Sequence, residues 1–354
     1  MSGIGDQRIA ERRIVFGPVA EAFAAIGLGG PVALVGTPRS LAALRDDMFA
    51  GAAVHRYDGV QPHNPRATVE EAGAFVDARA CRSIVAIGSS SAIDLGKAVA
   101  DKRDVVLALV PSALGGAEMS RGYGVLDGDR KVGGRLRSPA PVVVYDAALL
   151  ASLPARELGS IGINAWAHTV EAAYARTQHA LGGAAAISAG RLLPPLLIAA
   201  AARRDETLHS ALFANAHLAG FALDTRSMGL HHAVCHVVGG LTRIPHGIVN
   251  AVVLPHAIRA NARLAPDAVA AVAHGFGIPD LAAQAERIGG AYALPRTFAE
   301  LGAPADLVER ALPRVMEHRL LENNPAPPDE ATVAALLRAA YGGSAPGAEA
   351  ARAG

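Results

Sequence analysis

The stretch RSIVAIGSSSAIDLGKAVAD, residues 82–101, decides the fold class of this chain. Its first half is an apolar, β-branched run that ends at Gly88, and its second half alternates apolar and polar residues as a helix does. Fully apolar strands are what parallel sheets bury between two layers of helices. The stretch therefore predicts a buried strand, a turn of small residues and a helix.

Three more apolar runs surround this unit, at residues 31–37, 104–112 and 141–146. The first is followed by a predicted helix over residues 40–51. Alternation of strands and helices is typical of a doubly wound α/β domain. We expect an N-terminal, Rossmann-like parallel-sheet domain over residues 1–150.

The composition changes after Pro154, where alanine- and leucine-rich segments with helical periodicity take over. They predict a C-terminal all-helical domain over residues 151–354, with a disordered tail at 342–354. The most membrane-like run, residues 192–202, is broken by Pro194 and Pro195. A spanning helix needs about 20 apolar residues, so we expect a buried helix that follows a proline break.

The composition excludes several classes of protein. The chain has 354 residues, with 33 Lys+Arg against 32 Asp+Glu, so it lacks the basic excess of a nucleic-acid binder. Two cysteines exclude a disulfide framework and fit a reducing compartment. The N-terminus lacks the apolar core of a signal peptide. We expect a cytoplasmic protein that binds a small molecule and neither nucleic acid nor membrane.

The loop that begins at Gly88 can approach a phosphate. Small residues between a strand and a helix let backbone N–H groups point at an anion, which the helix dipole favours. The loop matches neither G-x-G-x-x-G nor a Walker A sequence, and such a turn is often only a helix cap. Both interpretations stay open on the residues alone.

Histidine placement is more informative. His231, His232, His236 and His246 fall close together, and His232 and His236 share one helix face. Upstream, Asn164 and His168 are also four residues apart. Converging imidazoles can bind a divalent metal, but a neutral amide is a poor substitute for a carboxylate ligand. They can equally transfer protons near neutral pH.

These histidine segments resemble the iron-containing (group III) alcohol dehydrogenase superfamily, which includes dehydroquinate synthase-like folds. The resemblance is carried by GINAWAHTVEA, GLHHAVCHVVGG with the following PHG and NAVVLPH, and VVVYDAALLASLP, and it runs from Arg13 to Gly343. Within the superfamily the chain is most similar to the maleylacetate reductases. Members are commonly homodimers, so the resemblance implies a homodimer.

The resemblance implies a set of site residues. The positions that hold iron or zinc in metal-dependent members are Asn164, His168, His232 and His246 here. Asn in place of Asp is the pattern of the metal-independent maleylacetate reductases, so no metal is expected. If one binds, the three histidines would hold it. His236 is the expected proton donor, while imidazolium forms of His168, His232 and His246 would hold substrate oxygens.

The implied reaction, part of aromatic compound catabolism, is the NADH- or NADPH-dependent reduction of 2-maleylacetate or a related enol or keto acid to a 3-oxoadipate-type product. The cofactor would lie in the cleft between the domains. No acidic residue follows the first strand, so both nicotinamide cofactors stay open. The expected cofactor-binding residues are Thr37, Pro38, Gly88, Ser89, Ser90, Ser91, Asp94, Pro111, Ser112, Leu114 and Lys131.

The chain departs from the family pattern at the cofactor loop and at the substrate side. Ser89 and Ser90 stand where the family has glycine, and Ala233 and Ala326 stand where the reductases carry Lys and Arg. The lost cations argue for a less anionic or larger substrate. Three alternatives therefore stay open: the same fold used for lyase, isomerase or cyclase chemistry without hydride transfer, a metal-dependent alcohol dehydrogenase, and a non-catalytic binding protein.

Overall fold

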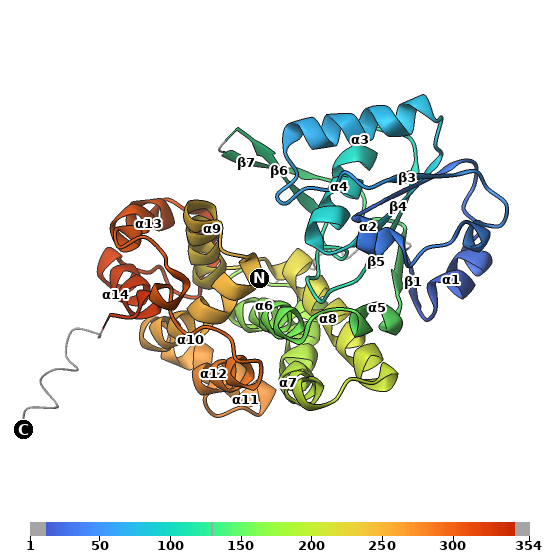
Figure 1. Ribbon diagram of the computed structural model, residues 1–354. Helices are drawn as coiled ribbons and strands as arrows, with labels where there is room; N and C mark the ends of the chain where they lie inside the picture. Colours follow the sequence, from blue (N-terminus) through green and yellow to red (C-terminus); the bar gives the residue numbers. More distant parts are fainter. Residues whose placement is uncertain (1–11, 129, 344–354) are drawn as a thin grey trace, which may run out of the picture. The chain divides into compact units, whose positions relative to one another are not determined.

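The computed structural model describes residues 12–128 and 130–343 (Figure 1). The chain divides into two compact units. The described residues of the first are 12–113, 117–128 and 130–150, and those of the second are 114–116 and 151–343. The predicted disordered tail falls on residues 344–354, outside the described part, apart from its first two residues.

The first unit is built on a six-stranded, all-parallel sheet of strand order β1-β8-β5-β4-β2-β3. The chain places β3 on one side of β2 and β4 on the other, so the strand order reverses between β2 and β4. In open α/β sheets such a reversal leaves a crevice at the carboxyl ends of the strands, where ligands bind. The strands are β1 (Arg13–Phe16), β2 (Val32–Gly36), β3 (Val54–Tyr57), β4 (Ser83–Gly88), β5 (Val106–Pro111) and β8 (Val142–Tyr145).

Alternate residues of the central strands cover the two faces of the sheet. Leu34, Ile87 and Val110 pack with Phe23 of α1 (Val19–Ile26) in one apolar cluster. On the other face α4 (Ser90–Ala100) lies so close to β4 that a Cβ on Gly96 would be 2.4 Å from that of Ala86. Both faces are covered, which is why the strands are apolar throughout.

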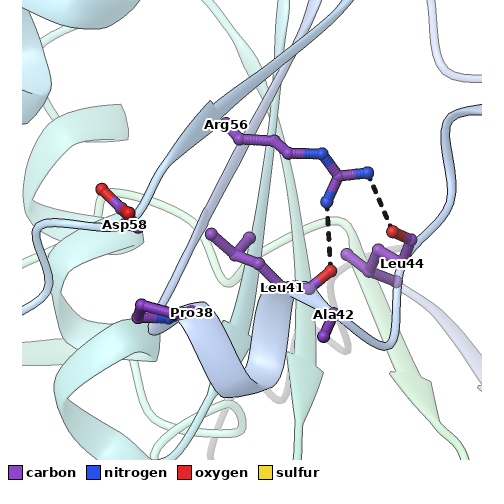
Figure 2. Close-up of a pocket in the computed structure, with 6 residues that line it drawn as sticks. All are labelled: Pro38, Leu41, Ala42, Leu44, Arg56 and Asp58. Carbon is purple, nitrogen blue, oxygen red and sulfur yellow. Dashed lines mark hydrogen bonds between the residues drawn. The ribbon is translucent and has the colours of Figure 1, made fainter.

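The structure confirms the four predicted strands and the predicted helix after Gly88. The helix predicted over residues 40–51 is wrong. α2 (Pro38–Leu41) is one turn long, and a 3₁₀ helix, η1 (Asp46–Phe49), follows it. After α2 the N–H of Leu44 bonds the carbonyl of Leu41 in a tighter turn, and the Arg56 guanidinium donates to the carbonyls of Leu41 and Leu44 (Figure 2).

Several elements of the first unit are not predicted from the sequence. They are β1, β3, α1, α3 (Arg66–Ala78), α5 (Ala147–Ala151), which belongs to the first unit up to Leu150, and an antiparallel hairpin of β6 (Gly122–Asp127) and β7 (Arg130–Arg135). Glycines at 122, 124, 133 and 134 interrupt the alternation of apolar and polar side chains by which a hairpin is predicted from sequence.

The second unit is helical in its described residues, as predicted. Its apolar core is formed by α9, α10, α13 and α14, together with the buried ring of Phe298. The helices are α6 (Ala155–Tyr174), α7 (Ala180–Ala202), α8 (Glu206–Arg226), α9 (Leu230–Thr242), α10 (His246–Leu264), α11 (Pro266–Phe276), α12 (Leu281–Ala291), α13 (Leu307–Met316) and α14 (Glu330–Tyr341), with the 3₁₀ helices η2 (Ala299–Leu301) and η3 (Arg319–Asn323).

Helix α7 corrects the predicted proline break, because it continues through Pro194 and Pro195. Proline removes the N–H that would bond the carbonyl four residues earlier. The carbonyl of Gly190, freed in this way by Pro194, instead accepts the indole N–H of Trp166 at 3.0 Å. By length and composition α7 is the one described helix apolar enough to cross a membrane, and it packs against α6 and α8.

Candidate active site

The predicted histidines meet in the second unit. The ring of His168 stacks on that of His232, with centroids 4.8 Å apart and an interplanar angle of 19°. The ring of His232 lies 6.1 Å from those of His236 and His246, which lie 6.0 Å from each other. These four residues form what we call the imidazole cluster. His168 and His232 are buried, His236 is half-buried and His246 is exposed.

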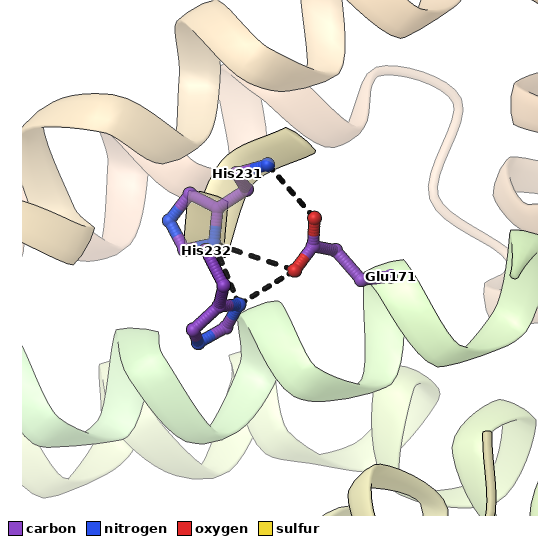
Figure 3. A group of neighbouring side chains, drawn as sticks. All are labelled: Glu171, His231 and His232. Carbon is purple, nitrogen blue, oxygen red and sulfur yellow. Dashed lines mark hydrogen bonds and ion pairs between the residues drawn. The ribbon is translucent and has the colours of Figure 1, made fainter. Parts of the chain in front are cut away.

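A buried carboxylate organises the inner part of the cluster (Figure 3). Glu171, on α6, accepts the backbone N–H of His231 at 2.8 Å and the Nδ1–H of His232 at 2.5 Å. On the other side of its ring, Nε2 of His232 lies 3.2 Å from Oδ1 of Asn164. An amide can either donate or accept, so Asn164 matches a neutral or a charged imidazole, whereas a carboxylate could only accept.

The start of α9 is held by residues distant in the sequence. Gly229 provides no side-chain cap, so the first N–H groups of the helix need other partners. Asn324 accepts from the N–H of Leu230 at 3.2 Å, and Glu171 accepts from His231. A Cβ on Gly229 would lie 2.9 Å from Oδ1 of Asn324, so only glycine fits between these partners.

The pKa shifts follow from burial and from these contacts. Burial acts to raise the pKa of Glu171, but hydrogen bonds from His231 and His232 outweigh it and hold that pKa well below its usual range. Burial lowers the pKa of His168 well below its ordinary value, and the neighbouring His232 and His246 lower it further. Burial also lowers the pKa of His232, against the opposing hydrogen bond to Glu171. His168 and His232 are therefore neutral near pH 7, which differs from the imidazolium form that we expected.

Two buried atoms in and beside the cluster, Nδ1 of His168 and Sγ of Cys235, differ in whether they can interact with a ligand. Nδ1 of His168 is buried and has no hydrogen-bond partner among the described residues, so a bound molecule or a water can engage it. Sγ of Cys235 lies 3.4 Å from Nε2 of His231. Burial raises the pKa of that thiol well above its ordinary value, so Cys235 is a packing residue and not a nucleophile.

The predicted phosphate loop lies at the strand-order reversal of the first unit. Gly88 ends β4 with φ of +143°, and a Cβ there would lie 2.9 Å from the Cβ of Ala92. Ser89 has φ of −80°, which any residue adopts, and its side chain does not cap α4. Because the one demanding backbone position is still glycine and the helix N-terminus is uncapped and exposed, the loop fits a pyrophosphate.

The other predicted cofactor residues differ in their exposure and in the hydrogen bonds that they already make. Thr37 and Pro38 are exposed at the end of β2, and Ser112 ties β5 to β4 through its N–H and the carbonyl of Gly88. The Asp94 carboxylate accepts a hydrogen bond from the N–H of Gly124 and forms an ion pair with Lys97. Exposed Ser90 and half-buried Ser91 begin α4, Pro111 ends β5, Leu114 belongs to the second unit, and the side chain of Lys131 lies outside the described part.

Sequence reasoning missed two side chains that contact the imidazole cluster, Glu171 and His318. Glu171 lies three residues after His168, a spacing that places both on one face of α6 and that could have been noticed. His318 lies just before η3, and its ring is 5.4 Å from that of His236. No signal near His318 in the sequence ties it to the other histidines.

The ligand set predicted for a metal contains no carboxylate. The positions predicted to hold an ion bring the neutral amide of Asn164 and the imidazoles of His168, His232 and His246. The bond from Nδ1 of His232 to Glu171 leaves Nε2 of that ring as its ligand atom. Among the described residues, the one set of possible ligand atoms within 4.8 Å of one another belongs to Glu171, His231 and His232. Hydrogen bonds join these three residues to one another.

The chain matches two family models that together span nearly all of it. Residues 12–147 match the model of iron-containing alcohol dehydrogenase, and residues 160–341 match that of the Fe-containing alcohol dehydrogenase family, C-terminal. The chain belongs to the iron-containing alcohol dehydrogenase family. This confirms the predicted resemblance and fold class, and with them the enzyme class, because enzymes of this family are NAD(P)H-dependent oxidoreductases.

Relatives within the iron-containing alcohol dehydrogenase family include maleylacetate reductases. That of Burkholderia cepacia is 33% identical over 85% of this chain and 86% of its own. The structure of maleylacetate reductase from Agrobacterium tumefaciens is 27% identical, with a TM-score of 0.85 over 96% of this chain and 98% of that one. Sulfoacetaldehyde reductase from Bifidobacterium kashiwanohense, solved with NAD⁺, shares the fold at 18% identity, with a TM-score of 0.86 over 97% and 100% of the chains.

Proposed function

We propose that this oxidoreductase works without a metal and reduces the carbon–carbon double bond of 2-maleylacetate or a related 4-oxo-2-enoic acid, giving a 3-oxoadipate-type product. The observation that carries the proposal is the Asn164–His232–Glu171 chain of contacts. It places a neutral amide, and not a carboxylate, beside Nε2 of His232, the ring nitrogen that could bind a metal. The maleylacetate reductase relatives support the substrate class.

The reaction needs one hydride and one proton. When bound, the nicotinamide cofactor supplies the hydride, which adds to the carbon β to the keto group. The electron pair of the double bond then moves onto the keto oxygen as an enolate, and a proton on the α carbon completes the two-electron reduction. We assign the proton to His236, which is half-buried between the inner and outer members of the imidazole cluster.

The remaining imidazoles stabilise the enolate. A neutral N–H aimed at a developing negative charge in a dry site lowers the barrier, because it needs no reorganisation during the reaction. His168 is suited to this role, since its Nδ1 is buried and unpartnered among the described residues. Glu171 and Asn164 position His232, and we do not assign either of them to proton transfer.

The cofactor-binding residues are proposed on the first unit. The uncapped start of α4 would receive the pyrophosphate. A pocket of about 450 Å³ next to Thr37 is lined by Pro38, Leu41, Ala42, Leu44, Arg56 and Asp58 (Figure 2). The Arg56 guanidinium is engaged by two carbonyls and by Asp46, while the Asp58 carboxylate would repel a 2′-phosphate. We therefore propose NADH over NADPH.

The non-redox alternative loses its main support. It depended on the loss of loop glycines, but Gly88 keeps the conformation that requires glycine and Ser89 has an ordinary one. A metal-dependent alcohol dehydrogenase is disfavoured because position 164 carries a neutral amide and not a carboxylate. A homodimer and a cytoplasmic location stay predictions.

The test is a turnover assay on untagged protein. We expect oxidation of NADH at 340 nm with 2-maleylacetate or its decarboxylated analogue, no loss of rate in EDTA, and less than one metal ion per chain. His236→Phe should abolish turnover while cofactor binding persists. Failure of both NADH and NADPH to bind at millimolar concentration would contradict the proposed function, as would a rate that depends on added zinc or iron.

A further inference from the structure

His318 is an imidazole with a fixed orientation at the edge of the cluster. It follows α13, and its backbone N–H donates to the carbonyl of Val315 at 2.9 Å. Its side chain caps η3, because Nδ1 accepts the N–H of Leu320 at 3.2 Å. Nδ1 of His318 is therefore occupied by the hydrogen bond that caps η3.

The other ring nitrogen of His318 is free for a ligand. The ring is half-buried, and its centroid lies 5.4 Å from that of His236 at an angle of 49°. Within residues 12–128 and 130–343 no group accepts a hydrogen bond from Nε2. His318 thus adds a third ring around His236, beside those of His232 and His246.

The capping bond also decides where the proton of His318 lies. A nitrogen that accepts an N–H cannot carry a proton itself, so the neutral ring carries its proton on Nε2. Burial lowers the pKa of His318, which keeps the ring neutral near pH 7. Protonation at Nδ1 would also break the bond to Leu320. His318 is therefore a neutral N–H donor and not a cation.

We propose that His318 is a specificity-determining residue whose Nε2–H donates to the keto oxygen of the substrate. Because the ring carries no charge, it offers no cationic partner for a second carboxylate, so the site prefers a 4-oxo-2-enoate with one carboxylate over a dicarboxylate. The inference rests on the proposed function and narrows its substrate class. A second carboxylate is bound well by a cationic partner, and a bidentate guanidinium binds it best. A neutral imidazole offers one hydrogen bond and no net charge.

Two substitutions separate capping from substrate contact. His318→Asn keeps an oxygen that can accept the Leu320 N–H, as Asn does at helix N-caps, but it lacks a donor at the Nε2 position. His318→Gln places a donor near the Nε2 position but caps poorly. The substrates are 2-maleylacetate and cis-acetylacrylate, which is the same molecule without one carboxylate.

We expect wild type to show the higher kcat/KM with cis-acetylacrylate. His318→Asn should lower that kcat/KM about tenfold, the equivalent of one hydrogen bond, with Tm maintained. His318→Gln should recover most of the lost kcat/KM while Tm falls, and His318→Arg should shift the preference toward 2-maleylacetate. Equal kcat/KM values of His318→Asn and wild type would overturn the proposal. So would a kcat/KM that falls in His318→Asn and His318→Gln in proportion to the fall in their Tm values.

A separate result would show that the proposed function is wrong: wild type would oxidise neither NADH nor NADPH in the presence of either acid. Calorimetric titration of both acids into wild type and His318→Asn then tests His318 by itself. Weaker binding of cis-acetylacrylate by the variant supports the assignment. Equal affinities, or no binding of either acid to wild type, overturn it.

Discussion

Oε2 of Glu171 lies 2.5 Å from Nδ1 of His232, and both side chains are buried. A carboxylate in this position orients the imidazole and fixes which nitrogen carries the proton. Carboxylates that accept the second N–H of a functional histidine have the same role in other proteins. Glu171 thereby links the helix that carries Asn164 and His168 to the helix that carries His232 and His236.

Replacing Glu171 tests this positioning role. Glu171→Gln keeps the shape of the side chain but removes the charge and one of the acceptors, so His232 loses its fixed tautomer. We expect kcat to fall about 10- to 100-fold with a small change in KM. Steady-state kinetics at 340 nm checks this, with Glu157→Gln, an exposed position on the same helix, as the control. An unchanged kcat in Glu171→Gln would assign the carboxylate to packing alone.

Acid should destabilise the chain in two stages. The pKa values of His168, His232 and Glu171 all lie below their ordinary values in the folded chain. As the pH falls, the unfolded chain binds each proton first, so the free energy of unfolding decreases. The loss should begin near pH 6.5 (about the ordinary histidine value) and steepen near pH 4.3 (about that of glutamate).

Urea unfolding between pH 7.5 and 4 measures this dependence. His168→Gln should flatten the slope between about pH 7 and 5.5, because it removes one histidine that is buried in its neutral form. Exposed His274→Gln is the control and should leave the slope as it is. Parallel curves for His168→Gln and wild type would contradict the assignment.

Cofactor binding should depend on Gly88 more than on the serines that follow it. Gly88→Ala imposes a side chain at φ of +143° and brings its Cβ 2.9 Å from that of Ala92. We expect the affinity for NADH, followed by nicotinamide fluorescence, to fall at least tenfold, whereas Ser90→Ala should change it less than threefold. Gly29→Ala, where a Cβ meets nothing within 4 Å, controls for stability. Similar affinities of Gly88→Ala and Gly29→Ala would refute the loop assignment.

Restoring a carboxylate at position 164 should restore metal binding. Asn164→Asp places a negative charge next to Nε2 of His232 and gives His168 and His246 an anionic fellow ligand. We expect the variant to retain zinc or iron near one ion per chain by elemental analysis, and wild type to retain much less. Asn215→Asp on α8 is the matched control. Stoichiometric metal in wild type would contradict the metal-independent proposal.

Asp58 should set the choice between the two nicotinamide cofactors. Asp58→Asn removes the charge that would repel a 2′-phosphate in the pocket next to Thr37. The ratio of kcat/KM for NADPH over NADH should rise about tenfold, a modest electrostatic effect at an exposed site. Asp104→Asn, also exposed, is the control. If the ratio stays constant, the adenosine end of the cofactor binds elsewhere.

The core of the sheet was predictable from the sequence because buried parallel strands are apolar on both faces. The runs around Leu34, Ile87 and Val110 show this, and the structure confirms them. Edge elements such as β3 and the β6–β7 hairpin lack such a signature. The continuous α7 was not predictable either, since it depends on an indole N–H from another helix reaching the carbonyl that Pro194 leaves free.

Spacing of side chains revealed the histidines but not their chemistry. The separations of Asn164 from His168 and of His232 from His236 indicated shared helix faces. The neutral state of His168 follows from burial, which only the packing of α6 against its neighbours decides. Glu171 went unnoticed because carboxylates are rarely buried, and the place of His318 beside His236 is set by how the chain folds back after α13.

The bond from the Leu230 N–H to Asn324 has a consequence for how the protein is made. During synthesis α6 and α9 leave the ribosome well before residue 324, so Glu171 can meet His231 early while the first N–H of α9 still lacks its acceptor. The first turn of α9 gains this acceptor only after residue 324 has been synthesised. A ribosome-stalled chain that ends before residue 324 should therefore hold the start of α9, and with it His231 and His232, less firmly than a longer chain does.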